Sequence, residues 1–228
     1  MKTAILVDGG FYRKRAATLW GKKTPQKRAD ELMAYCREHL RHERKFDDRS
    51  LYRIFYYDCP PLAKTVYHPL LKRGIDFRQS ETYTWANRFF DELKKQRKVA
   101  LRMGELSDSY AAYSLHPEKQ KDLFGNKIQM SDLTESDFSI SFSQKGVDMK
   151  IGIDITSMAY KKQVDQIILI AGDSDFVPAA KLARREGIDF ILDPMWLKIK
   201  DNLFEHIDGL RSQWKKKKPT QNNNIQAY

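Results

Sequence analysis

Residues 166–192 read QIILIAGDSDFVPAAKLARREGIDFIL. The aliphatic run at the start of this stretch predicts a buried strand, and the apolar run at its end predicts another. Between them, Pro178 in the first turn and Gly187 as the stop delimit a helix. A strand, a helix and a second strand in this order form a βαβ unit, which predicts a parallel sheet.

Strand-like and helix-like segments alternate in the same way along the rest of the chain. The predicted elements are strands at 3–7, within 50–61 and at 98–106, and helices at 27–40, 84–96 and 148–162. In 65–77 we expect a short helix, a glycine break and a strand, and 197–208 is expected to close the domain as a helix. This alternation predicts the α/β class with a mainly parallel central sheet.

Two segments differ from this pattern. Residues 107–144 are polar with scattered aromatic residues, and we interpret them as a long insertion containing a hairpin around Asn126. Residues 211–228 are basic and of low complexity, which predicts a disordered tail after a single domain of residues 1–210. The insertion and the tail are therefore expected to lie outside the core of the domain.

Composition and charge narrow the class of protein. Hydrophobic residues make up 41% of the 228 residues, which is typical of a folded soluble domain. The net charge is +11, of which the tail carries five charges, so the body keeps +6. A basic surface attracts polyanions such as nucleic acid or anionic lipid, although lysines that only maintain solubility explain the charge equally well.

The cysteines and the N-terminus bear on the compartment. Cys36 and Cys59 are the two cysteines, with neither a CxxC pair nor a histidine cluster, which argues against a disulfide scaffold or a thiolate zinc site. The apolar run at the N-terminus ends at Asp8 and is too short for a signal sequence or a membrane span. We therefore expect a cytoplasmic protein without a membrane partner.

Acidic residues follow the predicted strands where each strand ends. Asp8 comes directly after the first strand, and Asp173 and Asp175 follow the first strand of the opening stretch. Because ligands of open parallel sheets bind beyond the carboxyl ends of the strands, these carboxylates are expected to share one edge. Asp148 begins the helix at 148–162 and is expected to join them, with open space above it because Gly152 lies one turn further on.

Two further acids are peripheral candidates. Asp58 follows the aromatic strand of 50–61, and Asp154 lies about 240° around its helix from Asp148, which is more typical of a structural acid. Taken singly, an aspartate after a strand most often caps a helix or braces a turn. Four converging carboxylates, however, raise one another's pKa unless a cation neutralises them. An all-oxygen site without histidine or cysteine predicts Mg²⁺ or Mn²⁺.

Four segments of the chain resemble a known family. AILVDGGF, FYYDCPP, KGVDMKIGIDI and the opening stretch are similar to the NYN domains, in particular the bacterial LabA-like branch, which belong to the PIN-like nuclease superfamily. The resemblance implies a Rossmann-like three-layer sandwich, an acidic pocket for Mg²⁺ or Mn²⁺, and cleavage of RNA. By motif position it implies metal binding by Asp8, Asp148 and Asp173, with Asp175 completing the cluster. Phe11 stands where many members have asparagine, so a polar contact from that position is in doubt.

The expected reaction is hydrolysis of a phosphodiester with two metal ions, which leaves a 5′-phosphate and a 3′-hydroxyl. The carboxylates act as ligands, one of them can relay the proton of the water, and no side chain serves as nucleophile. We expect an endoribonuclease acting on single-stranded or looped RNA. The residues expected to contact nucleic acid are Lys145, Arg13, Lys14, Arg102, Tyr12 and Ser174.

Three alternatives stay open at this point. A phosphatase of the haloacid-dehalogenase type needs a second aspartate two residues after Asp8, where this chain has Gly10. A module that binds nucleic acid without turnover is a second alternative. A structure-specific DNA nuclease, with the insertion at 107–144 as a clamp, is the third. DNA in place of RNA and a second copy of the chain also remain open as partners.

Overall fold

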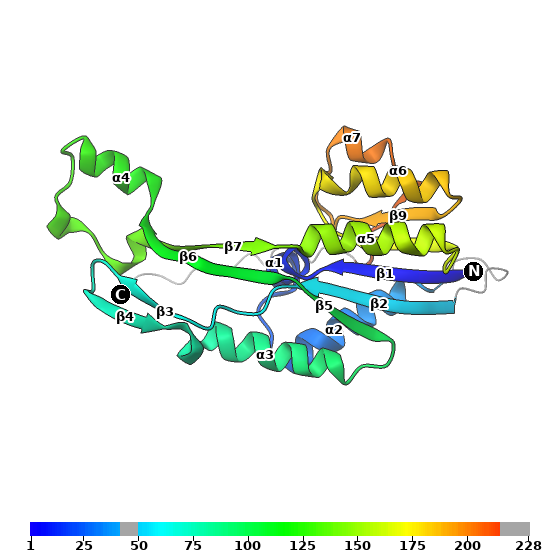
Figure 1. The fold of residues 1–228 in the computed structure, drawn as a ribbon, viewed down its shortest axis with the longest axis horizontal. Helices are drawn as coiled ribbons and strands as arrows, with labels where there is room; N and C mark the ends of the chain where they lie inside the picture. The colour runs from blue at the N-terminus through cyan, green and yellow to red at the C-terminus, as the bar shows by residue number, and fades with distance from the viewer. Residues whose placement is uncertain (42–49, 215–228) are drawn as a thin grey trace, which may run out of the picture.

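A six-stranded, fully parallel sheet forms the centre of the protein (Figure 1). The computed structural model describes residues 1–41 and 50–214, apart from the side chains of 107–110, 144 and 174. The strand order is β10-β9-β8-β1-β2-β5. The bounds are β1 Lys2–Asp8, β2 Ser50–Asp58, β5 Val99–Met103, β8 Gln166–Ile170, β9 Asp189–Asp193 and β10 Gly209–Leu210. This arrangement confirms the predicted α/β class.

Helices cover both faces of the sheet. On one face Ala4 and Leu6 of β1 pack in the core beneath α5 (Val147–Tyr160), α6 (Val177–Arg185) and α7 (Asp201–Phe204). On the other face Ile5 and Val7 pack in the core beneath α1 (Gly9–Trp20), α2 (Pro25–Glu38) and α3 (Glu81–Lys94). Alternate residues of β1 therefore face opposite layers, as the twofold period of a strand requires, and the result is a three-layer sandwich.

Two antiparallel hairpins lie outside the sheet. The shorter one pairs β3 (Thr65–His68) with β4 (Arg73–Asp76), and the longer one pairs β6 (Glu105–Leu115) with β7 (Phe138–Lys145). Residues 105–145 form what we call the arm, which extends away from the sheet and carries α4 (Pro117–Phe124) at its far end (Figure 1). The buried ring of His68 joins the hairpins, since its centroid lies 4.2 Å from that of Tyr113 and 5.2 Å from that of Phe138.

The arm corresponds to the predicted insertion at 107–144. Its link between the strands contains α4 and the short 3₁₀ turns η2 (Met130–Asp132) and η3 (Glu135–Asp137), with Asn126 in the turn after α4. Asn126 adopts φ 56°, a left-handed conformation that asparagine tolerates better than most residues. The predicted hairpin is therefore present, but its strands are separated by a structured tip.

Three local predictions were wrong. The helix expected at the start of 65–77 is the hairpin β3–β4, and the helix expected over 197–208 shrinks to α7. The loop expected at Gly9 and Gly10 is absent, because α1 begins directly at Gly9 with Asp8 as its cap. The predicted tail of 211–228 lies almost entirely outside the described residues.

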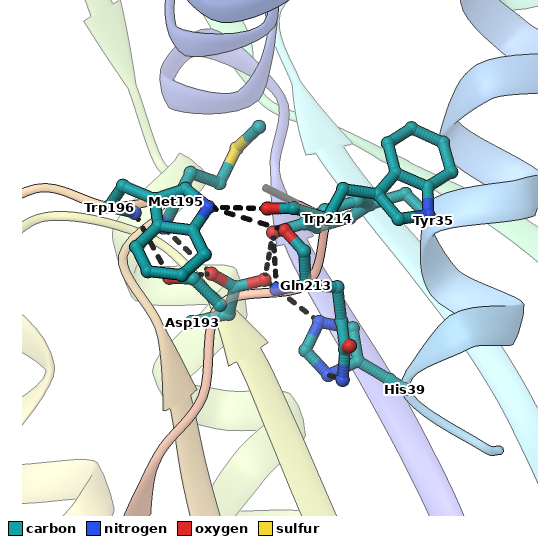
Figure 2. A network of polar contacts seen from close by, with 8 residues as sticks. Tyr35, His39, Asp193, Met195, Trp196, Gln213 and Trp214 are labelled. Carbon is teal, nitrogen blue, oxygen red and sulfur yellow. Dashed lines mark hydrogen bonds and ion pairs between the residues drawn. The ribbon is translucent and has the colours of Figure 1, made fainter. Parts of the chain in front are cut away.

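The end of the described chain is held by a buried carboxylate at the end of β9 (Figure 2). Asp193 is fully buried and accepts hydrogen bonds from Tyr35 Oη at 2.5 Å, Ser212 Oγ at 2.9 Å and Met195 N at 2.7 Å. Its Oδ2 also lies 2.8 Å from His39 Nε2. These contacts hold the segment after β10 against Tyr35 of α2.

None of the helices in residues 1–41 and 50–214 combines the length and the apolar character needed to span a lipid bilayer.

Candidate active site

Asp8 lies at the carboxyl end of β1 and also begins α1. Its Oδ1 accepts a hydrogen bond from the backbone N–H of Phe11 at 3.1 Å, so the carboxylate caps the helix. Burial raises its pKa to about 6; the Phe11 hydrogen bond opposes this rise, and the charges of Asp148 and Asp58 add to it. Asp8 is thus a capping residue that lies among other carboxylates.

Asp58 lies near Asp8 because β1 and β2 pair in parallel, with Asp8 opposite Tyr57, the residue before Asp58. A β-carbon at Gly9 would lie 2.6 Å from Asp58 Oδ2 and 2.5 Å from the Tyr56 ring, so only glycine fits there. Asp58 is buried and pairs with Arg13 at 2.9 Å, and it accepts hydrogen bonds from Cys59 N at 2.8 Å and Tyr56 Oη at 3.2 Å. Burial raises its pKa, while Arg13 opposes the rise. Asp58 is therefore fully partnered.

Asp148 reaches the same edge from the first turn of α5. The turn before it is tight, with Gly146 at φ +80° and Gly104 so close that an added β-carbon would lie 2.7 Å from the Lys145 carbonyl oxygen. A β-carbon at Gly152 would meet nothing within 4 Å, which agrees with the open space expected there. Asp148 is largely exposed, and its pKa is raised by partial shielding from water, then by Asp173 and Asp175.

Asp173 and Asp175 lie in the turn from β8 to α6, and both are exposed. Asp173 Oδ1 accepts a hydrogen bond from the backbone N–H of Asp175 at 3.3 Å, which braces the turn. This turn touches the start of α1, because a β-carbon at Gly172 would lie 2.4 Å from Cε2 of Phe11. The ring of Phe11 therefore packs on Gly172 in the β8–α6 turn, an apolar contact at the position where many NYN domains have asparagine.

Electrostatic coupling links these acids into one row. Asp58 and Asp148 both influence Asp8, and Asp173 and Asp175 influence Asp148. The four aspartates at positions 8, 148, 173 and 175, which we call the acidic edge, form no ion pair with a lysine or arginine among the described residues. Within that same part of the chain, no group of three or more His, Cys, Asp or Glu side chains is arranged to hold a metal ion together.

The peripheral acid Asp154 is paired elsewhere. Its Oδ2 accepts hydrogen bonds from Tyr57 Oη at 2.8 Å and from Arg102 Nε at 3.0 Å. The guanidinium of Arg102 also lies 5.2 Å from the centroid of the Phe55 ring. Asp154 therefore has the partners of a structural acid, as its position on the helix predicted. Metal binding by Asp154 or Asp58 stays a prediction.

The residues expected to contact nucleic acid lie in different environments. Lys145 and Lys14 are exposed, whereas Arg13 and Arg102 are held by Asp58 and Asp154. Base stacking by Tyr12 was wrong, because α1 begins at once after Asp8 and turns this ring into the core. Tyr12 is fully buried, and its hydroxyl donates to Glu31 Oε1 at 3.3 Å. The side chain of Ser174 lies outside the described residues.

A cavity beside Arg13 was not predicted from the sequence. It has a volume of about 280 Å³ and lies between the loop after β2, the start of α3 and strand β7 of the arm. Ile140 and Phe142 of β7 form part of its wall. Their alternation with serines in SISFS is typical of a strand with one apolar face, a signal that the interpretation of this stretch as an insertion did not use.

Comparisons with known proteins give two matches of different kinds. No curated protein matches the chain. A crystal structure of a protein of unknown function from Vibrio parahaemolyticus RIMD 2210633 is similar, with a TM-score of 0.45 and 14% identity over 92% of this chain and 90% of that chain.

The family match covers the fold from β4 to just past β9 and includes most of the acidic edge. Residues 75–196 match the sequence model of the NYN domain, and this range contains Asp148, Asp173 and Asp175 but not Asp8. NYN domains are nuclease-type domains of the PIN-like superfamily, whose substrates are nucleic acids and which generally use divalent metals. The chain belongs to the NYN domain family.

Proposed function

We propose that this protein is a divalent-metal-dependent ribonuclease of the LabA-like branch that hydrolyses phosphodiester bonds of single-stranded or looped RNA. The observation that carries the proposal is the contrast among the acids at this end of the sheet. Asp58 and Asp154 are each neutralised by an arginine, whereas the four carboxylates of the acidic edge have no such partner among the described residues. The charge of Asp148 raises the pKa of Asp8, and those of Asp173 and Asp175 raise the pKa of Asp148, so these uncompensated carboxylates favour binding of a cation.

The chemistry of the donor set fits Mg²⁺ or Mn²⁺. The candidate ligands Asp8, Asp148, Asp173 and Asp175 offer only carboxylate oxygens, which hard divalent cations prefer. When bound, such ions neutralise phosphate charge and lower the pKa of water, and a pair of them serves two-metal hydrolysis. The exposed positions of Asp148 and Asp175 leave these two side chains accessible to a ligand.

The chain itself orients these groups and attracts the substrate. The Phe11 N–H holds one oxygen of Asp8, and the Asp175 N–H holds one oxygen of Asp173, so two carboxylates are positioned before a ligand arrives. The amines of Lys145 and Lys14 are exposed and can donate to phosphate oxygens of a nucleic acid. The net charge of +11 draws a polyanion toward the protein.

The arm does not have the charge of a nucleic-acid clamp. Residues 105–145 contain seven acids and four lysines, a net charge of −3 in a protein of net charge +11. A clamp that grips duplex phosphates requires the opposite sign. The arm therefore gives no support to a flap-type DNA nuclease, and RNA remains the substrate we favour.

The test is a cleavage assay with end-labelled single-stranded RNA, duplex RNA and flap DNA in Mn²⁺, Mg²⁺ or EDTA. We expect metal-dependent cleavage of single-stranded RNA that leaves 5′-phosphate and 3′-hydroxyl ends. Asp173→Asn and Asp148→Asn are each expected to reduce it about 100-fold or more, because loss of a residue that only supports a metal ligand already costs roughly 10- to 100-fold. Asp91→Asn is the matched control, because Asp91 lies on α3 and pairs with Lys94 away from the acidic edge.

Other outcomes would refute the proposal in distinct ways. Binding of RNA without cleavage in every metal would indicate a non-catalytic binding module. Preferential cleavage of the flap would indicate a DNA nuclease. Release of phosphate from a small phosphomonoester, lost in Asp8→Asn, would indicate a phosphatase, although Gly10 occupies the position where that chemistry needs its second acid.

A further inference from the structure

The cavity between the arm and the sandwich lies directly beside the acidic edge. Arg13 lines it, and the same guanidinium pairs with Asp58 at 2.9 Å. The other oxygen of Asp58 lies 2.6 Å from the position of a β-carbon on Gly9, the residue after Asp8. The cavity therefore adjoins the Arg13–Asp58 pair, and that pair in turn contacts Gly9, the residue next to Asp8 of the acidic edge.

The lining is apolar and aromatic. Phe77, Tyr83 and Phe142 contribute rings, Pro61 contributes a flat apolar surface, and Ile140 contributes an aliphatic side chain. Arg13 is the charged residue of this lining, and Asp58 compensates its charge. A phosphate or a carboxylate would leave such a site without a free cation to pair with, so the cavity suits a neutral, planar group.

Polar atoms at one side of the cavity can read the edge of such a group. The hydroxyls of Thr82 and Tyr83, at the start of α3, have no hydrogen-bond partner among the described residues. The volume of about 280 Å³ lies just below the range of roughly 300–1,000 Å³ typical of pockets for drug-sized ligands. It accommodates one ring system and not a stretch of strand.

The position of the arm's charge agrees with a neutral occupant. Five of its seven acids lie in residues 117–137 at the far end, whereas Ile140 and Phe142 lie in β7 between that end and the sheet. The part of the arm that lines the cavity thus presents apolar side chains to it. Proteins that bind single-stranded RNA combine contacts to the backbone with stacking of unpaired bases on aromatic rings and hydrogen bonds to the base edges.

We propose that this cavity binds one unstacked nucleobase of a single-stranded RNA, next to the nucleotide whose phosphate lies at the acidic edge. The inference rests on the proposed function in taking RNA as the ligand, but it makes a statement about binding that does not require cleavage. It also gives the arm a role: β7 supplies one wall of the base pocket, so RNA without an accessible base cannot use the site.

The test compares two single-stranded ligands of equal charge. One is a fluorescently labelled 12-nucleotide RNA, and the other is a ribose-phosphate chain of the same length with abasic sites. Their affinities for the full chain are measured by fluorescence anisotropy in EDTA, so that no cleavage occurs. Because stacking of one base typically changes affinity about five- to 150-fold, the wild type is expected to prefer the base-containing RNA by at least about tenfold.

Two variants act on the cavity in opposite ways. Phe142→Ala removes a ring from the wall, and Thr82→Trp fills the cavity from the exposed start of α3. Each is expected to reduce the preference for bases about tenfold and to leave binding of the abasic chain unchanged. Phe124→Ala is the matched control, since Phe124 is 77% exposed at the tip of the arm and does not line the cavity. Thr82→Trp keeps the test valid if Phe142→Ala disturbs the arm.

Each outcome decides the inference. An equal affinity of the wild type for both ligands, absence of binding to both, or a base preference that survives both cavity variants overturns it. A wild type that cleaves RNA in Mn²⁺ but fails this test keeps the nuclease and loses the base pocket. A wild type that passes it without cleaving in any metal keeps the base pocket and loses the nuclease.

Discussion

The contact between Phe11 and Gly172 permits a quantitative prediction about how the acidic edge is assembled. In Gly172→Ala the new methyl would lie 2.4 Å from Phe11 Cε2, whereas carbon atoms in contact are normally about 3.5–4.0 Å apart. Such overpacking typically costs about 1–3 kcal/mol. The half-buried Phe11 ring can move in part, so we expect about 1–2 kcal/mol of destabilisation. For a chain of this size, that lowers Tm by about 2–8 °C.

A double-mutant cycle isolates the contact. Phe11→Ala removes the ring and makes room for the methyl, so Gly172→Ala is expected to cost at least about 1 kcal/mol less in the Phe11→Ala background than in the wild type. The measurement is urea unfolding followed by circular dichroism for the wild type, both single variants and the double variant. Additive effects within about 0.5 kcal/mol would refute the contact, and with it the argument that this ring brings the β8–α6 turn against α1.

Three further predictions concern stability. In EDTA, the free energy of unfolding is expected to fall by up to about 3 kcal/mol as pH rises from about 4 to 6. The cause is that the folded state keeps the Asp8 proton up to a pKa of about 6, whereas the unfolded state loses it near 3.8. Urea unfolding of the wild type and Asp8→Asn across this pH range checks the prediction, and an equal dependence on pH in both proteins would contradict it. Asp193→Ala is expected to cost about 3–5 kcal/mol because it leaves Tyr35 and other buried partners unsatisfied, and urea unfolding that shows less than 1 kcal/mol would rule out this buried network. Gly146→Ala is expected to cost about 1–2 kcal/mol because an L-residue must adopt φ +80°, and an unchanged Tm would show that the turn before α5 relaxes.

Local patterns were sufficient for the framework of the fold. Buried parallel strands are continuous apolar runs, so β1 and β8 could be recognised without knowledge of their neighbours. The carboxyl ends of such strands lie at one edge, which placed Asp8 and Asp173 together in advance. The stripe of α5 was also foreseen, since Ile151 and Ile155 are fully buried.

Local patterns failed where a segment's partner determines its structure. Gly9 and Gly10 predict a loop, but packing of α1 against the sheet overrides their low helix propensity and buries Tyr12. The hairpin β3–β4 is stabilised in the same way, by the contact of His68 with the rings of the arm. In these cases tertiary packing outweighs local propensity.

The sequence by itself determined which residue types stand at the ends of the strands, because strand period and chain order are local properties. It placed four aspartates at one edge, with Asp58 as a peripheral candidate and Asp154 set apart as a structural acid, but it could not show which of these acids an arginine neutralises. Only the tertiary structure decided that Arg13 neutralises Asp58 and that Arg102 neutralises Asp154, while the four acids of the acidic edge have no such partner among the described residues. The reason is that an ion pair forms only when its two groups lie within a few ångströms of each other. Arg13 and Asp58 are 45 positions apart in the sequence, and Arg102 and Asp154 are 52 positions apart, so only folding brings them together.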